Sequence, residues 1–210
     1  MSTILYIKAS PREERSYCAA VAEAFLDSCT RLHPEEVVKR LDLFKRSLPP
    51  FDLAAATAKY KIMHGKGHSP ADREIWDEVV ALIQEFKAAD KYVFAVPMWN
   101  FSIPYRLKQY IDIIVQPGLT FSVDEKGNYG GLVTGKPVFV AYSRGGRYEP
   151  GSAAESFDLQ RKYVELILRF IGFEEILSIV VEPTLAAGPD TAGQKRLAAI
   201  DAAKKMAGVF

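Results

Sequence analysis

The stretch YVFAVPMWNFSIPYRLKQYIDII, residues 92–114, contains a predicted strand, a loop and a predicted helix in direct succession. Residues 92–96 are apolar and rich in β-branched and aromatic side chains, which is typical of a buried parallel strand. Apolar residues recur at helical spacing over 105–114. The intervening loop, residues 97–104, therefore follows the carboxyl end of a strand, where ligands bind in open α/β sheets.

This loop has two compatible interpretations. Pro97 and Pro104 restrict its backbone, and Pro104 suits the first turn of the helix that follows. A stiff loop that carries the flat ring of Trp99 and the amide of Asn100 suits a planar ligand with polar edges. Alternatively, Trp99 and Phe101 fill the core at an ordinary turn between a strand and a helix.

Strand and helix patterns alternate along the rest of the chain. Mostly apolar runs predict further strands at residues 4–9, 137–142 and 174–181, and residues 36–43 are also interpreted as a strand. Helices are predicted from a cap at Ser16 to about Cys29, and at about 70–89, 105–114, 159–170 and 191–207, with a small hairpin over 119–131. This order predicts a single α/β domain spanning residues 1–210, with a doubly wound sheet of five parallel strands and helices on both faces.

The composition excludes several classes of protein. With 27 basic and 26 acidic residues, the net charge of +1 predicts no nucleic-acid or membrane partner. No apolar run approaches the roughly 20 residues of a spanning helix. Cys18 and Cys29 form no C-x-x-C pair, and His64 and His68 lack the H-E-x-x-H pattern, so we expect neither a disulfide scaffold nor a metal site. The first strand begins near Thr3 without a leader pattern, so we expect a cytoplasmic protein.

The loop after the first strand, residues 10–18, is either an anion site or the start of an ordinary capped helix. Ser16 suits the N-cap position, and hydroxyls and backbone N–H groups at the positive end of a helix hold phosphates. Arg12 and Arg15 are close by in sequence. The loop contains no glycine, so G-x-G-x-x-G and Walker A motifs are absent from it.

Two other loops attract attention. Residues 143–148 follow the fourth strand, and the pair Gly145–Gly146 allows backbone N–H groups to approach the edge of a ligand. A plain turn is equally compatible with that pattern. Residues 44–70 are long for a simple connection, so we expect a functional loop or short helices that cover a site.

Together, these loops resemble those of the FMN-dependent azoreductases and NAD(P)H:quinone oxidoreductases. The resemblance extends over nearly the whole chain and rests on residues 9–12 with Ser16, 97–104, 118–121, 143–146 and 170–173. Among these segments, PMWNFSIP is similar to the family's P-M-Y-N-F-x-I-P and is a strong signal. The resemblance implies a flavodoxin-like fold that binds FMN.

The resemblance also implies which residues bind the cofactor. The FMN phosphate would contact Ser10, Arg12, Ser16, Tyr17 and Cys18. The isoalloxazine ring would be flanked by Pro97, Met98, Trp99, Asn100 and Phe101. Its pyrimidine edge would be lined by Ser143, Arg144, Gly145 and Gly146. The chain departs from the family at Trp99, often a tyrosine, and at Cys18, often a serine; a thiol is the weaker donor, but the backbone N–H groups remain.

The implied activity is a ping-pong reaction. A hydride passes from NADH or NADPH to the flavin N5 and then to a quinone or azo compound, so no side chain is expected to act as a catalyst. The predicted contacts with substrate are Trp99, Phe121 and Tyr148. The family also implies a homodimer, in which residues 44–70 and 118–131 are candidates for completing the partner's pocket.

Two other functions are compatible with the same loops. One is a flavin reductase, which releases reduced FMN after each turnover. The other is a flavodoxin-like electron carrier without NAD(P)H turnover. A carrier usually needs an acidic docking surface, which a net charge of +1 does not supply.

Overall fold

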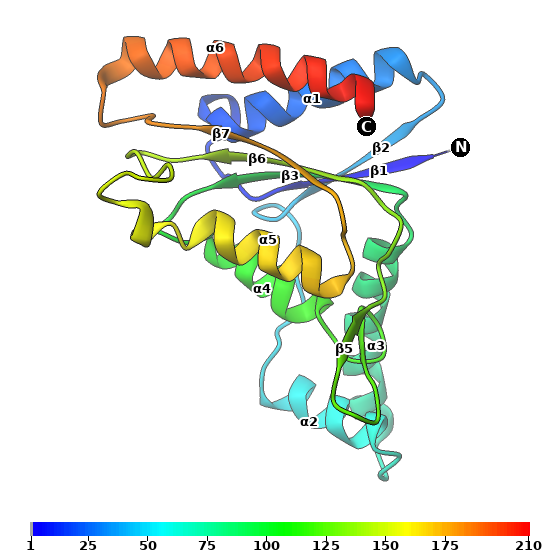
Figure 1. The fold of residues 1–210 in the computed structure, drawn as a ribbon. Helices are drawn as coiled ribbons and strands as arrows, with labels where there is room; N and C mark the ends of the chain where they lie inside the picture. The colour runs from blue at the N-terminus through cyan, green and yellow to red at the C-terminus, as the bar shows by residue number, and fades with distance from the viewer. Residues whose placement is uncertain (1) are drawn as a thin grey trace.

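Five parallel strands form the central sheet of the computed structural model, which describes residues 2–210 (Figure 1). The strands are β1 Thr3–Lys8, β2 Val37–Asp42, β3 Lys91–Pro97, β6 Val138–Ser143 and β7 Ile176–Val181. Their order across the sheet is β2-β1-β3-β6-β7. This order corresponds to the 2-1-3-4-5 arrangement of doubly wound, flavodoxin-like sheets, and the predicted fold class is confirmed.

Helices cover both faces of the sheet (Figure 1). One face is covered by α1 Tyr17–Leu32 and α6 Gly188–Met206. The other is covered by α3 Pro70–Lys87, α4 Tyr105–Ile114 and α5 Gln160–Ile171. The loops that precede α1, α4 and α5 follow β1, β3 and β6. Because these strands are parallel, the three loops lie together at the carboxyl edge of the sheet, which we call the rim.

The sheet divides the core into two layers because side chains alternate along each strand. In β1, Ile4 and Tyr6 face α1 and α6, whereas Leu5 and Ile7 face the opposite helices. The first layer includes the ring of Phe25, which stacks on Phe139 with centroids 3.9 Å apart. Fully burying one such side chain stabilises a fold by about 1.5–3 kcal/mol.

The helix boundaries follow from local signals in the sequence. Ser16 caps α1, where its side chain accepts a hydrogen bond from the Ala19 N–H, as predicted. Ser69 and Asp72 form a reciprocal capping box at the start of α3. Gly172, with φ of 120°, ends α5 in a conformation that other residues rarely adopt.

Two excursions extend beyond the doubly wound core. Residues 44–70 form α2 Leu53–Met63, which packs against α3. The predicted hairpin is present as β4 Phe121–Val123 and β5 Tyr129–Gly131 (Figure 1). Across residues 2–210, no helix has the length and apolar character that crossing a membrane requires.

Candidate functional site

Three loops meet at the carboxyl edge of the sheet, and they follow β1, β3 and β6. Backbone hydrogen bonds continue the sheet into these loops: Ala9 N–H donates to the Ala95 carbonyl at 2.9 Å, and Met98 N–H to the Ser143 carbonyl at 2.8 Å. Adjacent strands lie about 4.8 Å apart, so β1 and β6 are separated by roughly 10 Å. One small molecule can therefore contact all three loops.

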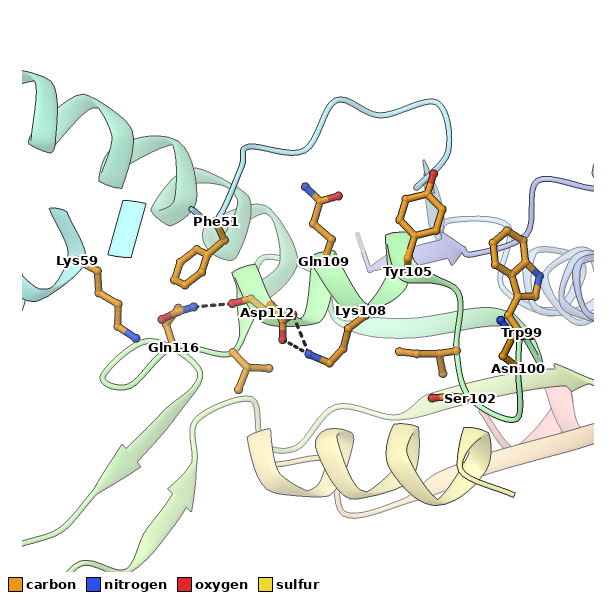
Figure 2. Close-up of a pocket in the computed structure, with 12 residues that line it drawn as sticks. Phe51, Lys59, Trp99, Asn100, Ser102, Tyr105, Lys108, Gln109, Asp112 and Gln116 are labelled. Carbon is orange, nitrogen blue, oxygen red and sulfur yellow. Dashed lines mark hydrogen bonds and ion pairs between the residues drawn. The ribbon is translucent and has the colours of Figure 1, made fainter. Parts of the chain in front are cut away.

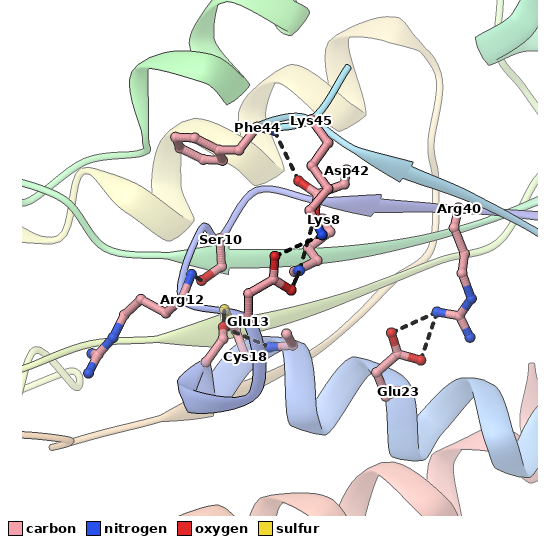
Figure 3. Close-up of polar contacts among 12 residues, drawn as sticks. Lys8, Ser10, Arg12, Glu13, Cys18, Glu23, Arg40, Asp42, Phe44 and Lys45 are labelled. Atoms are coloured by element: carbon pink, nitrogen blue, oxygen red, sulfur yellow. Dashed lines mark hydrogen bonds and ion pairs between the residues drawn. The ribbon is translucent and has the colours of Figure 1, made fainter.

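The loop after β1 forms a cradle of buried hydroxyls and free donors, residues 9–18, which we call the cradle (Figure 3). Ser10 is fully buried and its Oγ accepts from the Arg12 N–H at 3.4 Å. The Ser16 Oγ accepts from the Ala19 N–H at 3.3 Å. Within the described chain, the N–H groups of Tyr17 and Cys18 donate to no oxygen. Unpaired N–H groups at the start of a helix form an anion site.

Cys18 links the cradle to the end of β6. Its thiol is fully buried and lies 3.3 Å from the Ser16 Oγ. Burial raises the pKa of this thiol, and a hydrogen bond with the Ser143 side chain only partly opposes that shift. The group is therefore a neutral thiol at neutral pH and supplies packing and weak hydrogen bonds.

Arg12 and Tyr17 lie on the outer side of the cradle. Arg12 is exposed, and Figure 3 shows its side chain extending away from the other labelled residues. Tyr17 is half-buried, and its ring lies 6.0 Å from the guanidinium carbon of Arg196. Both residues belong to the segment that contains the free donors, and Arg12 contributes a positive charge to its exposed side.

An ion-pair chain supports the cradle from the side of β2 (Figure 3). Glu13 contacts Lys8 and Lys45, each at 2.9 Å, and Lys8 also contacts Asp42 at 3.1 Å. Hydrogen bonds from Lys45 and Lys8 lower the pKa of Glu13 from 4.5 to about 2. Glu13 also adopts a left-handed φ of 46°, so these two lysines hold a backbone conformation that glutamate rarely takes.

The loop after β3 contains a tight turn of the hairpin type, residues 99–102, which we call the aromatic turn. Trp99 and Ser102 exchange backbone hydrogen bonds of 3.0 and 2.9 Å. Between them Asn100 and Phe101 both have positive φ, 47° and 67°. Two such residues in succession define a type I′ turn, which normally uses glycine. A bulky residue held there costs about 1–3 kcal/mol, and such strain is concentrated at functional sites.

The rings of the aromatic turn lie on the surface rather than in the core. The side chains of Trp99 and Phe101 are 36% and 46% exposed, so the core-filling interpretation of these two residues is wrong. Trp99 lies 5.8 Å from Phe44 and 6.2 Å from Tyr105, between ring centroids. Phe101 lies 5.1 Å from Phe157. The turn therefore presents aromatic faces beside the free donors of the rim.

The loop after β6 brings two backbone donors to the same rim. Gly145 and Gly146 donate no backbone hydrogen bond to any of residues 2–210. A Cβ on Gly145 would lie 3.0 Å from a methyl group of Leu185, and one on Gly146 would lie 3.1 Å from the hydroxyl of Tyr148. A side chain at either position would therefore press against Leu185 or Tyr148, whereas glycine does not. Ser143, the last residue of β6, is buried beside them.

The side chain of Arg144 is directed into the protein. It is buried, and its guanidinium donates to Asp158 at 2.7 Å, Gln160 at 3.0 Å and Glu182 at 3.4 Å. The protein's own oxygens therefore occupy this guanidinium, and the contact of Arg144 with the cofactor stays a prediction. A guanidinium buried without partners would strongly destabilise the fold, so these three acceptors are what allow Arg144 to be buried.

The two remaining predicted substrate contacts have different locations. Tyr148 lies at the rim, with its ring 6.3 Å from that of Phe101. Phe121 lies on β4 and packs against Phe170 with centroids 4.7 Å apart. Because α4 runs about 15 Å from the rim to the hairpin, Phe121 does not join the other site residues of its own chain. The contact of Phe121 with substrate therefore stays a prediction, and it fits the expectation that residues 118–131 complete the pocket of a partner copy.

A groove of about 890 Å³ extends from the rim along α4 (Figure 2). Trp99 and Asn100 lie at one end, and Lys59 and Gln116 at the other. Sequence reasoning did not select Tyr105 or Phe44, which border the turn. The sequence contained one signal for Tyr105, because this aromatic residue lies outside the apolar stripe of its helix and is therefore expected on the surface. In the structure it is 64% exposed.

Comparisons with known proteins agree with this geometry. A family model described as a flavodoxin-like fold matches residues 2–206. The FMN-dependent NADH:quinone oxidoreductase of Nitratidesulfovibrio vulgaris is 56% identical over 207 residues, 99% of each chain. The crystal structure of an azoreductase from Bacillus anthracis superposes with a TM-score of 0.91 at 30% identity, covering 100% of both chains. An FMN-dependent NADH-azoreductase from Bacillus anthracis, solved with FMN, superposes with a TM-score of 0.86 at 26% identity, covering 99% of this chain and 100% of that one.

Proposed function

The chain belongs to the family with the flavodoxin-like fold, and from this membership we propose that it is an FMN-dependent NADH:quinone oxidoreductase that also reduces azo compounds. The observation that carries the proposal is the convergence of two sets of free backbone donors with an aromatic turn between them. One set suits a phosphate and the other suits the polar edge of a ring. FMN has both groups at its two ends.

The cradle fits the phosphate of FMN. The N–H groups of Tyr17 and Cys18 and the Ser16 hydroxyl converge at the positive end of α1, where an anion is stabilised. The buried Ser10 lies beside them, and Arg12 adds a positive charge on the exposed side. The chain thus offers donors to a phosphate without a glycine-rich loop.

The other two loops fit the isoalloxazine ring. Pro97, Met98 and the aromatic turn flank the space beside β3, and the amides of Gly145 and Gly146 point to a polar edge. Fixed N–H dipoles stabilise negative charge where it develops, so these amides favour the reduced form of a flavin. When bound, FMN supplies the hydride chemistry between NAD(P)H and the acceptor.

The side chains of the site bind and orient rather than react. Trp99 and Tyr148 offer exposed aromatic surface to a flat donor or acceptor at the rim. No side chain is assigned as a nucleophile or a general acid. Successive occupation of one space by NAD(P)H and by the acceptor gives ping-pong kinetics.

A homodimer is the proposed assembly. A second groove, of about 490 Å³, runs between α4 and α5 and is lined by apolar side chains that include Leu159 and Leu166, 54% and 64% exposed. It shares Ser102, Ile103 and Lys108 with the groove of Figure 2, so apolar surface surrounds the aromatic turn. A second copy on this face would close the substrate space, and the partner's Phe121 would then line it.

The proposed partners and location follow from charge and cysteine chemistry. The nearly balanced charge supports small aromatic acceptors rather than nucleic acid or membranes as partners. Cys18 and Cys29 are both buried and unpaired with each other, which suits the reducing cytoplasm.

Steady-state kinetics test the function. Purified protein loaded with FMN should oxidise NADH with a quinone, and double-reciprocal plots at several quinone concentrations should give parallel lines. A second series with NADPH measures the preference between donors. A yellow protein that turns over with neither donor would be a carrier, and loss of FMN on reduction would identify a flavin reductase.

A further inference from the structure

The buried guanidinium of Arg144 lies at a junction of the rim's supporting elements. Its partners are Asp158 and Gln160, at the start of α5, and Glu182, directly after β7. The side chain of Arg144 is only 2% exposed, and those of Asp158 and Glu182 are 8% and 10% exposed. Charge-assisted bonds in such a shielded place are strong and directional.

Each partner of Arg144 holds a different segment of the rim. Gln160 is fully buried, and its Nε2 donates to the Val96 carbonyl at 2.9 Å, one residue before the loop that follows β3. The Glu182 carboxylate accepts from the Tyr148 N–H at 3.0 Å. The guanidinium thereby connects the end of β3, the end of β7 and the loop that contains the two glycines.

The backbone of Arg144 is also held on both sides. Its N–H donates to the Val181 carbonyl at 3.0 Å, and its carbonyl accepts from the N–H and hydroxyl of Thr184, each at 2.9 Å. Gly145 follows directly, and its carbonyl accepts from Leu185 and Ala186. These bonds turn the carbonyls of Arg144 and Gly145 inward, while the N–H groups of Gly145 and Gly146 donate to none of residues 2–210.

The same cluster places an uneven charge behind these amides. Within this hydrogen-bonded cluster one guanidinium faces two carboxylates, Asp158 and Glu182, so the formal charge of the cluster is −1. The neighbouring cation, Arg161, is partly exposed and pairs with Glu165 at 2.7 Å. The negative charge of the cluster acts over several ångströms in a shielded site and opposes negative charge on a bound ring. The amides therefore stabilise negative charge on a bound ring, and the carboxylates destabilise it. The positive charge of Arg144 determines how strong the effect of the carboxylates is.

We propose that Arg144 is a positioning residue that determines how much more tightly the site binds reduced than oxidised FMN, because it holds the Gly145–Gly146 amides and neutralises one of two buried carboxylates. This inference rests on the proposed function and extends it to the cofactor's reduction potential. It also explains why the chain places an arginine beside two glycines yet directs it away from the rim.

The test compares three variants by FMN affinity and by reduction potential. Oxidised FMN affinity is measured by fluorescence quenching, and the potential by equilibration with a reference dye under anaerobic conditions. Arg144→Met should lower the ratio of reduced to oxidised affinity about tenfold, a shift of about 30 mV downward for a two-electron couple. Glu182→Gln removes a carboxylate charge, so it should shift the ratio upward.

Arg147→Met is the matched control. Arg147 lies in the same loop, and its replacement removes the same charge, but its side chain is 61% exposed and pairs with Glu149 at 3.6 Å. Solvent screens this charge, so the ratio should change less than about twofold. A ratio that falls equally in Arg147→Met and Arg144→Met would overturn the assignment to the buried cluster.

The remaining outcomes separate this inference from the proposed function. If Arg144→Met does not fold, the upward shift in Glu182→Gln supports the inference and an unchanged ratio overturns it. If the unmodified chain binds FMN and both variants keep its ratio, the inference alone is overturned. If the unmodified chain takes up no FMN at all, the proposed function and this inference fail together.

Discussion

The cradle and the aromatic turn lie side by side at the rim but are built in opposite ways. In the cradle, Ser10, Ser16 and Cys18 are at most 3% exposed, and a helix cap determines their positions. In the turn, Trp99 and Phe101 are 36% and 46% exposed, and Asn100 and Phe101 have a left-handed backbone that normally uses glycine.

This difference matches two separate tasks. A phosphate presents the same oxygens in every turnover, so a rigid and buried set of donors suits it. A nicotinamide and a quinone must occupy one space in succession, so exposed rings on a strained turn suit them. We therefore expect substitutions in the cradle to change cofactor affinity and substitutions in the turn to change substrate kinetics.

The largest effect is expected in the cradle. Ser16→Ala removes both a helix cap and a hydroxyl aimed at the phosphate, so FMN affinity should fall about 10- to 100-fold, the value of one hydrogen bond to a charged group. Ser69→Ala is the matched control, because it removes the cap of α3 far from the rim. Both variants should lose about 1 kcal/mol of stability. Equal FMN affinities in the two variants would contradict the role of Ser16.

The next effect is expected in the aromatic turn. Trp99→Ala should raise the KM for quinone about tenfold, because one exposed ring contributes about 1.4 kcal/mol of contact, and should change FMN affinity less than threefold. Steady-state kinetics and fluorescence titration measure the two quantities. Leu197→Ala, which removes an exposed apolar side chain of α6, serves as the control. A variant that unfolds would show that Trp99 is needed for packing, which would contradict its role as an exposed substrate contact.

A smaller effect is expected from the ion pairs that support the cradle. The folded pKa of Glu13, about 2, lies below its ordinary 4.5, so its stabilising effect is complete above pH 4.5 and is lost as the pH falls through about 2. Glu13→Gln should therefore lower the Tm by less than about 3 °C at pH 7. The difference from the unmodified chain should shrink as the pH falls below 4.5. A difference that persists at pH 2 would show that shape, not charge, is responsible.

The smallest effect is expected at Cys18. Cys18→Ser restores the hydroxyl that the family often has, and the backbone N–H of residue 18 is unchanged. FMN affinity should stay within about threefold, because the exchange alters only part of a neutral hydrogen bond, which contributes about 0.5–1.5 kcal/mol in full, and the thiol already occupies the space. A large gain in affinity would show that the side chain, rather than the amide, dominates at this position.

Periodic features of the fold were predictable from the sequence. Mostly apolar runs located four of the five strands, and Ser16, Ser69 and Gly172 marked helix ends through local chemistry. The resemblance located the rim loops because PMWNFSIP combines several uncommon residues in one short segment. The topology also contained a signal that was missed. Since α4 leads away from the rim, Phe121 had to lie at the opposite end of its own chain.

Two features of the site were not predictable from residue types. Asn100 and Phe101 adopt a turn that normally uses glycine, so no sequence pattern marked it. Arg144 has the same neighbours in sequence whether its side chain points outward or inward. Its direction depends on Asp158 and Glu182, which are 14 and 38 residues away and meet it only in the folded chain.

The crystal structure of the FMN complex tests the central claim most directly. We expect the phosphate on the N–H groups of Tyr17 and Cys18, and the ring between the aromatic turn and Gly145, with its pyrimidine edge on the glycine amides. Density for the phosphate away from α1, or a ring beyond hydrogen-bond distance of both glycines, would contradict a single site shared by the three loops.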